Sequence, residues 1–243
     1  MGVSLSKSPD LIAGMFDAIA NDYDLLNHLL SAGIDRRWRK RAIAALELAG
    51  TERVLDLCTG TADLAIAART ARPPAARVVG VDFAGAMLRA GRTKVSDRRL
   101  GDTISLVRAD ATQSPIADGS VDAVTIGFGI RNVENAKAVC DEISRVLRPG
   151  GRLAILEFAI PATPMVRAAY LAYFRYVLPQ VGQLISHHNA AYRYLPASVA
   201  AFASPDEFMK LLRQHRFADI KAIPLTFGIV FLYTARRSAA LEP

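Results

Sequence analysis

Cysteine, long apolar runs and a leader-like start are scarce or missing in this sequence, and each absence excludes a class of protein. Cys58 and Cys140 are the two cysteines, and their wide separation matches neither a disulfide scaffold nor a metal-ligand spacing. We therefore expect two reduced thiols, as in a cytosolic protein. No window approaches about 18 uninterrupted apolar residues, so we expect no membrane-spanning helix. The stretch from Met1 to Asp10 lacks a basic region followed by an apolar one, so we expect no signal peptide.

The sequence also lacks the glycines of a dinucleotide-binding fingerprint. After the apolar run Arg53–Cys58, that fingerprint requires glycine where Cys58 and Asp63 stand. This absence argues against an NAD-dependent oxidoreductase on a related sheet, which otherwise remains a rival interpretation.

What is present is the composition of an ordinary globular protein. Hydrophobic residues make up 51% and charged residues 22% of the 243 positions, which excludes wholesale disorder and collagen-like structure. The length favours one elaborated domain over two. A net charge of +7 and a pI near 9.7 suit an anionic partner such as nucleic acid or a membrane surface.

Apolar periodicity predicts alternating strands and helices. Residues 11–30 and 34–48 have helical spacing, and the unit of strand followed by helix then repeats. We predict strands at Arg53–Cys58, Arg77–Asp82, Thr103–Ala109, Val121–Phe128 and Leu153–Phe158, with helices at Leu64–Thr70, Ala84–Val95 and Ala136–Leu147, the last stopped by Pro149-Gly150-Gly151. Such alternation is typical of a parallel sheet with helices on both faces.

The pattern changes after Pro161. Tyrosines crowd residues 170–194 without a clear strand, which predicts a helical insert that covers the sheet edge. Ser204-Pro205-Asp206-Glu207 predicts a capped helix start, and that helix should run to about His215. Two further strands, at Ile220–Leu225 and Ile229–Thr234, form a closing pair. The total is seven strands.

Polar residues at the strand ends indicate a ligand site, because an open parallel sheet binds ligands beyond the carboxyl ends of its strands. Asp82 ends the second strand, where a carboxylate can accept both hydroxyls of a ribose. Asp110 offers an acceptor to an adenine amino group, and Ala111 is small enough to admit the ring. The turn from Asp56 to Asp63, with Gly60 inside it, allows close approach of a ligand that carries an ammonium group. Together they favour S-adenosylmethionine, although surface carboxylates and an ordinary turn remain alternatives.

Longer stretches resemble one protein family. The stretches are Tyr-Asp-Leu-Leu-Asn-His-Leu-Leu-Ser from Tyr23 to Ser31, Gly-Phe-Gly-Ile-Arg-Asn-Val from Gly127 to Val133, and Arg-Val-Leu-Arg-Pro-Gly-Gly-Arg-Leu from Arg145 to Leu153. They are similar to the C-methyltransferases of menaquinone and ubiquinone biosynthesis, which are class I S-adenosylmethionine-dependent methyltransferases. The similarity runs from about Phe16 to Arg236.

The resemblance implies a Rossmann-like class I methyltransferase with a seven-stranded, mostly parallel sheet and an antiparallel C-terminal strand. We expect one domain over 1–243, with an N-terminal helical cap (1–50), a cofactor-binding core (51–160), a helical insert (161–203) and a closing helix and strand pair (204–237). The family's cofactor contacts fall on Thr61, Asp82, Asp110, Ala111 and Gly127. Ala62 departs from the family, which has glycine there.

The resemblance also implies an acceptor, a reduced quinone with a polyprenyl tail. Demethylmenaquinol is the main interpretation, and a benzoquinol precursor of ubiquinone is the alternative. A non-catalytic regulator that binds S-adenosylmethionine is a further rival. The aromatic insert and the apolar N-terminal helix can line a path for the tail, and core packing is the alternative role for both.

Arg131 and Asn132 follow the fourth strand and can stabilise a developing oxyanion. Arginine rarely loses a proton, so we interpret Arg131 as an anion binder rather than a base, with a loop salt bridge as the alternative. Asp63 can orient Arg131 or a water, and Tyr23 can close the pocket. We expect no metal site, because the adjacent His187–His188 point differently in most backbones, although either can face the quinol.

Basic residues are concentrated beside Trp38. They are Arg36, Arg37, Arg39, Lys40 and Arg41. No nucleic-acid-binding motif accompanies them, whereas a lipid acceptor favours an anionic membrane surface. We expect a cytoplasmic protein, peripheral at the inner face of the membrane. The sequence is compatible with a homodimer but does not determine the oligomeric state.

Overall fold

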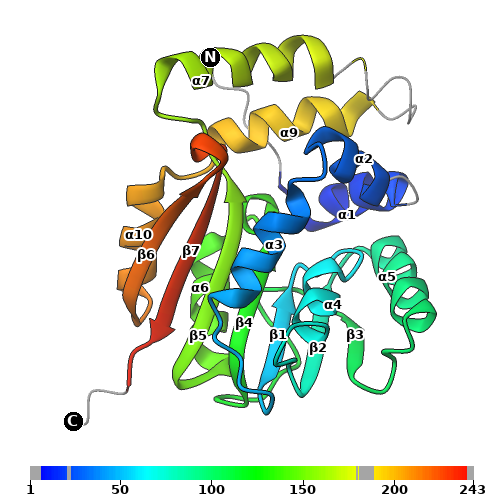
Figure 1. The fold of residues 1–243 in the computed structure, drawn as a ribbon, viewed down its shortest axis with the longest axis vertical. Helices are drawn as coiled ribbons and strands as arrows, with labels where there is room; N and C mark the ends of the chain where they lie inside the picture. Colours follow the sequence, from blue (N-terminus) through cyan, green and yellow to red (C-terminus); the bar gives the residue numbers. More distant parts are fainter. Residues whose placement is uncertain (1–6, 21–22, 179, 181–188, 240–243) are drawn as a thin grey trace.

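The computed structural model describes residues 7–20, 23–178, 180 and 189–239. Within them lies a seven-stranded sheet in the order β3-β2-β1-β4-β5-β7-β6 (Figure 1). The strands are β1 (Arg53–Leu57), β2 (Arg77–Asp82), β3 (Ile104–Arg108), β4 (Val121–Gly127), β5 (Leu147–Phe158), β6 (Phe217–Leu225) and β7 (Val230–Arg237). β1 to β5 pair in parallel, and β7 runs antiparallel to both β5 and β6. The predicted fold class is confirmed.

Helices cover both faces of the sheet, because each strand buries alternate side chains on opposite sides. Val54 joins the core under α3 (Asp35–Ala44), α4 (Asp63–Arg69) and α5 (Gly85–Asp97). Leu55 joins the core under α6 (Ala136–Val146) and α10 (Pro205–Gln214). The predicted capping box is confirmed, since Ser204 and Glu207 each bond the other's backbone.

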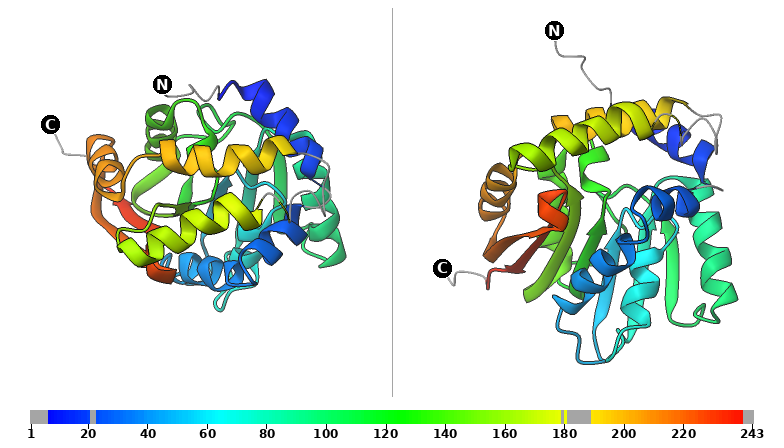
Figure 2. Two further views of the ribbon diagram at one scale, coloured as in Figure 1. Left: turned by 90° about the horizontal axis from the view of Figure 1, so that it is seen from above. Right: turned by 45° about the horizontal axis from the view of Figure 1, so that its top comes forward.

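The remaining helices lie across the carboxyl ends of the strands (Figure 2). They are α1 (Pro9–Ile19), α2 (Tyr23–Leu30), α7 (Pro164–Ala172), α9 (Asn189–Ala201) and the short turns η1 (Ile130–Asn132), η2 (Tyr173–Val177) and η3 (Thr226–Gly228). The sequence pattern predicts a helical insert that covers a sheet edge. In the structure the insert lies across the carboxyl ends of the strands instead. β5 ends and α10 begins at the carboxyl side, so the insert between them spans that side (Figure 1).

Two element boundaries also differ from prediction. Residues 11–30 form two helices, α1 and α2, because apolar spacing continues past the end of α1 and carries no sign of the break. β5 begins at Leu147 instead of Leu153, so Pro149-Gly150-Gly151 lies inside the strand. Gly150 has a φ of +75°, and the pairing of β4 with β5 shifts register beside it. This bulge lets proline and glycine occupy the strand.

Candidate functional site

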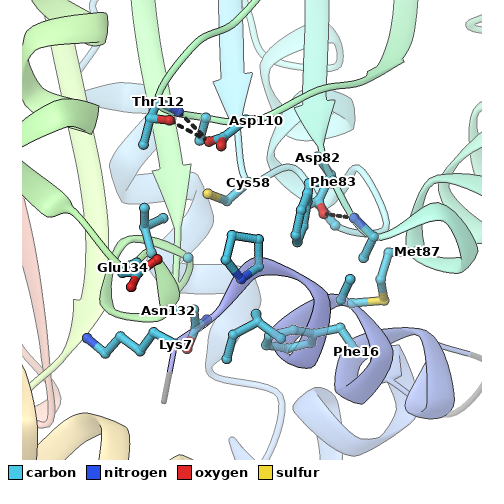
Figure 3. A pocket seen from close by; sticks show the side chains of 18 of the residues that line it. Lys7, Phe16, Cys58, Asp82, Phe83, Met87, Asp110, Thr112, Asn132 and Glu134 are labelled. Carbon is cyan, nitrogen blue, oxygen red and sulfur yellow. Dashed lines mark hydrogen bonds between the residues drawn. The ribbon is translucent and has the colours of Figure 1, made fainter. Parts of the chain in front are cut away.

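A cavity of about 270 Å³ opens at the carboxyl ends of β1 to β4, and we call it the strand-end cavity. Figure 3 shows Cys58, Asp82 and Asp110 on one side of it, with Asn132 and Phe16 of α1 on the other side. The sheet order brings these strand ends together although they are far apart in sequence. Gly60, Ala111 and Gly127 also line the cavity.

Asp82 is held by backbone donors at the end of β2. Its Oδ2 accepts from the Gly60 amide at 2.8 Å and its Oδ1 from the Ala84 amide at 2.9 Å. Burial raises the pKa of Asp82, and these hydrogen bonds oppose the shift. Asp110 is exposed and its Oδ1 accepts from the backbone and hydroxyl of Thr112, at 2.7 and 2.8 Å. Both carboxylates therefore have defined orientations at the cavity wall.

Asp56 lies behind the turn instead of on its surface, with only 1% of its area exposed. Its carboxylate accepts from the Thr59 and Thr125 hydroxyls, both at 2.6 Å, and from the Ala65 amide at 3.2 Å. Burial raises the pKa of Asp56 to about 6. The side chain thereby ties the turn to β4 and α4.

The turn that follows β1 has residues in the left-handed backbone conformation beside the cavity. Gly60 has a φ of +54° and Ala62 a φ of +67°, a conformation that favours glycine. This explains physically why glycine suits the position where this chain has Ala62. A Cβ on Gly127 would lie 2.7 Å from Leu64, and one on Gly129 would lie 2.3 Å from the Cβ of Cys58. The sequence prediction included Gly127 but missed Gly129.

Thr61 and Asp63 face an ion-pair network between α2, α3 and α5. The Thr61 hydroxyl donates to Asp24 at 2.6 Å, and Lys94 pairs with both Asp24 and Asp63. Asp63 also pairs with Arg39 at 3.1 Å, and it lies with Thr61 around a small hollow beside the strand-end cavity. Asp63 is therefore not brought to Arg131, and its partners are Lys94 and Arg39.

Arg131 pairs with a carboxylate that sequence reasoning missed, Glu157. Its Nη1 lies 2.7 Å from Glu157 Oε1, and its backbone amide donates to Oε2 at 3.1 Å. Its Nε lies 3.4 Å from the Ser198 hydroxyl. Arg131 is 6% exposed and Glu157 is 0% exposed. The signal for Glu157 was available, because a lone acid inside an apolar strand requires a buried partner.

Arg131 also lines a second cavity, of about 410 Å³, which we call the apolar cavity. Its walls come from α1, α2, α3, the insert and the end of β5. They include Met15, Phe16, Ile19, Tyr23, Trp38, Phe128, Phe158, Tyr170, Phe174, Leu178, Tyr194 and Ile229. The rest of the lining includes polar or charged side chains, which are Asn27, Ser31, Asp35, Arg39, Arg131 and Thr226.

The two cavities share Phe16, Tyr23 and Phe128 as lining residues. The Tyr23 ring packs edge-on against Phe16 with centroids 6.0 Å apart, and burial raises the pKa of its hydroxyl. Asn132 lines the strand-end cavity and donates from Nδ2 to the Phe128 carbonyl at 3.3 Å. Its buried Oδ1 has no hydrogen-bond partner within the described part of the chain.

Two other expectations concern regions or groups away from these cavities. His187 and His188 lie outside the described residues. Among the residues that are described, no three His, Cys, Asp or Glu side chains form a group that could hold a metal. In that same part of the chain, every helix is too short or too polar to cross a membrane.

Residues 4–237 match the model of the ubiE/COQ5 methyltransferase family. The chain belongs to this family. A ubiquinone/menaquinone biosynthesis C-methyltransferase from Syntrophotalea carbinolica is 48% identical, over 92% of this chain and 93% of that protein. A demethylmenaquinone methyltransferase from Thermus thermophilus is 46% identical, over 92% of this chain and 100% of that protein. This member of the ubiE/COQ5 family is an S-adenosylmethionine-dependent methyltransferase.

Solved structures agree with the fold of a class I methyltransferase. The geranyl diphosphate C-methyltransferase of Streptomyces coelicolor, solved with S-adenosylhomocysteine, superposes with a TM-score of 0.61. The two sequences are 18% identical, and the match covers 86% of this chain and 82% of that one. At this identity the likeness concerns the fold alone.

Proposed function

We propose that this ubiE/COQ5 family member transfers a methyl group from S-adenosylmethionine to a ring carbon of a polyprenylated quinol, with demethylmenaquinol as the acceptor. One observation carries the proposal. A strand-end cavity with ribose- and adenine-type acceptors meets an apolar cavity at Tyr23 and Phe128, and a buried cation, Arg131, lines the apolar side. A benzoquinol precursor of ubiquinone is the second candidate, because one relative's name joins both pathways.

The strand-end cavity fits S-adenosylmethionine. Asp82 would hold the ribose hydroxyls, Asp110 and Ala111 the adenine, and Gly60 of the Asp56-supported turn the methionine part. The buried Oδ1 of Asn132 is an acceptor that lacks a partner among the described residues, as expected beside a ligand that donates or carries positive charge. When bound, S-adenosylmethionine would supply a methyl group on a positively charged sulfur, which an electron-rich ring carbon of the acceptor would take up in exchange for a proton.

The residues of the chain act on the acceptor. A quinol ring carbon becomes nucleophilic when a neighbouring hydroxyl loses its proton, and Arg131 would bind the resulting oxyanion. Glu157 fixes the guanidinium and Asn132 supports the loop at Phe128, so little reorganisation is needed. Tyr23 closes the junction of the two cavities. Thr61 and Asp63 are positioning residues, since their side chains tie α2, α3 and α5 together beside the turn.

The cap over the strand ends binds the tail and excludes water. We propose that segments 1–50 and 161–203 form this cap over the cofactor-binding core 51–160, with 204–237 completing the sheet. Segment 1–50 and the insert supply most of the lining of the apolar cavity, whose volume of about 410 Å³ holds a ring and the first part of an isoprenoid chain. The rest of the tail must leave the cavity.

A tail of this kind places the enzyme at the cytoplasmic surface of the membrane. Arg36, Arg37, Lys40 and Arg41 are exposed on α3 and can contact anionic lipid. Arg39 does not belong to this surface, because it pairs inward with Asp35 at 2.6 Å and with Asp63. The exposed basic surface of α3 therefore contains four of the five basic residues that are consecutive or nearly so in the sequence, without Arg39.

Two assays test the proposal. Reduced naphthoquinone and benzoquinone acceptors are each supplied with methyl-labelled S-adenosylmethionine, and label should pass to the naphthoquinol. Transfer to the benzoquinol alone would favour the second candidate, and transfer to neither would leave a non-catalytic regulator. Thermal stabilisation by S-adenosylhomocysteine and not by NAD should separate this enzyme from an oxidoreductase.

A further inference from the structure

Two buried hydroxyls in the apolar cavity lack partners. Tyr170 of α7 and Tyr194 of α9 line the cavity, and neither phenolic oxygen has a hydrogen-bond partner within the described residues. The Tyr170 side chain is 7% exposed. A buried hydroxyl without a partner destabilises the folded chain, whereas phenylalanine would fill the same space without that cost. Phe174 also lines the cavity, and its ring packs at a tilt against that of Tyr170 with centroids 4.3 Å apart, so the cavity accepts phenylalanine.

Both hydroxyls lie within the electrostatic influence of the same ion pair. Burial raises the pKa of Tyr170 and of Tyr194, the Arg131 charge lowers it and the Glu157 charge raises it again. The two tyrosines therefore stay neutral at physiological pH and act as hydrogen-bond donors, not as bases. They come from different helices of the insert and line the same cavity as Arg131.

We propose that the Tyr170 and Tyr194 hydroxyls, together with Arg131, form a binding site for the oxygen of a hydroxylated aromatic ring in the apolar cavity. This inference rests on the proposed function and names the residues that orient its acceptor. A hydrocarbon tail cannot form hydrogen bonds with these hydroxyls, so the ring oxygen would lie against them and the tail against the apolar side chains of the cavity. That orientation sets which ring carbon faces the junction at Tyr23.

The test measures ring binding separately from catalysis. The wild-type enzyme, Tyr170→Phe, Tyr194→Phe and the double variant are titrated calorimetrically under argon with 1,4-dihydroxynaphthalene and with naphthalene. Trp38, the single tryptophan, lines the same cavity. Quenching of its fluorescence, corrected for absorption by the ligand, reports that the ring occupies this cavity. Tyr176→Phe is the matched control, because Tyr176 is 58% exposed and is not part of the cavity lining.

Each phenylalanine variant should bind 1,4-dihydroxynaphthalene about 3- to 10-fold more weakly, the effect of one lost hydrogen bond. Binding of naphthalene should stay unchanged, and Tyr176→Phe should behave as wild type. Equal affinity of wild type and both variants for the dihydroxy ring, or no quenching of Trp38 in wild type, would overturn the inference.

The outcome separates the two proposals. Loss of dihydroxynaphthalene binding in the variants, combined with no methyl transfer to any quinol by wild type, would keep the phenol site and reject the quinol methyltransferase. Methyl transfer by wild type, combined with unaltered dihydroxynaphthalene binding in the variants, would keep the quinol methyltransferase and reject the phenol site.

Discussion

Nη1 of Arg131 lies 2.7 Å from Oε1 of Glu157, and both side chains are buried, with Arg131 lining the apolar cavity. The pair joins η1 to the end of β5, and the Glu157 carboxylate also accepts from the Arg131 and Phe158 amides. A buried pair of this kind stabilises the fold only while both partners remain, because either charge alone would be left uncompensated.

Glu157→Gln should therefore destabilise the protein by about 3 to 5 kcal/mol, since the Arg131 charge loses its counterion in a buried place. Urea denaturation measures the change in the free energy of unfolding. Glu157→Leu and Arg131→Met should each be destabilising alone, and the variant with both should recover most of the loss, which the double-mutant cycle of these three variants reports as strong coupling. Additive effects of the two single changes would contradict a mutually dependent pair.

Arg131→Ala should lower kcat by about 10² to 10³-fold, because a donor that meets the quinol oxygen mainly as it becomes an anion acts on the transition state. KM for the quinol should change less, and Arg131→Lys should recover part of kcat, since lysine keeps the charge without the planar fork. Steady-state kinetics at saturating cofactor measure both constants. A normal kcat in Arg131→Ala would remove this residue from catalysis.

Asp82→Ala should weaken S-adenosylhomocysteine binding by roughly 1.5 to 3 kcal/mol, because hydrogen bonds from the ribose to a charged acceptor are lost. Titration calorimetry measures the affinity. Asp82→Asn serves as a second variant of nearly the same shape, and Asp97→Ala, an exposed change on α5, should bind as wild type. Unchanged affinity in both Asp82 variants would place the ribose elsewhere.

Asp56 predicts a pH dependence of stability. Its pKa of about 6 in the folded state lies above the ordinary aspartate value, so the folded state binds the proton more tightly than the unfolded state. The stability that this proton contributes is fully present below about pH 4 and is lost as pH rises through about 6. Asp56→Asn lacks this titration. The stability of wild type relative to Asp56→Asn should fall by about 2 to 3 kcal/mol between pH 4 and pH 7.5. A constant difference across that range would show that the carboxylate is not perturbed.

Vesicle binding should depend on the exposed basic residues of α3. Replacing Arg36 and Arg37 with glutamine should weaken binding to anionic vesicles by about 1 kcal/mol of binding free energy per residue, as measured by sedimentation. Added salt should also weaken binding. The same change at Arg98 and Arg99, which are exposed at the end of α5, is the matched control. Equal binding to neutral vesicles would contradict an electrostatic attachment.

The central strands and their terminal residues could be predicted from sequence. Buried parallel strands are continuous apolar runs, so β1, β2 and β4 were predicted within a residue or two of their observed bounds. Once the strands are known, the sheet brings Asp82 and Asp110 to one cavity without further information. Local sequence patterns suffice for both steps.

Pairings between distant segments could not be predicted in this way. The partners of Asp63 depend on how α3 and α5 pack beside α4, and no local pattern records that Lys94 reaches it. The pairing of Glu157 with Arg131 depends on η1 lying against the end of β5. The position of Tyr170 in the same cavity as Arg131 depends on the insert folding over the strand ends. The break between α1 and α2 was missed because apolar spacing describes a face and not the continuity of a helix.

The position of the transferred methyl group tests the central claim most directly. The enzyme is incubated with reduced demethylmenaquinone and S-adenosylmethionine carrying a ¹³C-labelled methyl group, and the product is examined by carbon NMR. The account predicts a labelled methyl on a ring carbon, formed by wild type and almost absent with Arg131→Ala. A labelled methyl on oxygen, or an unmodified quinol in the presence of folded wild-type enzyme and bound cofactor, would contradict it.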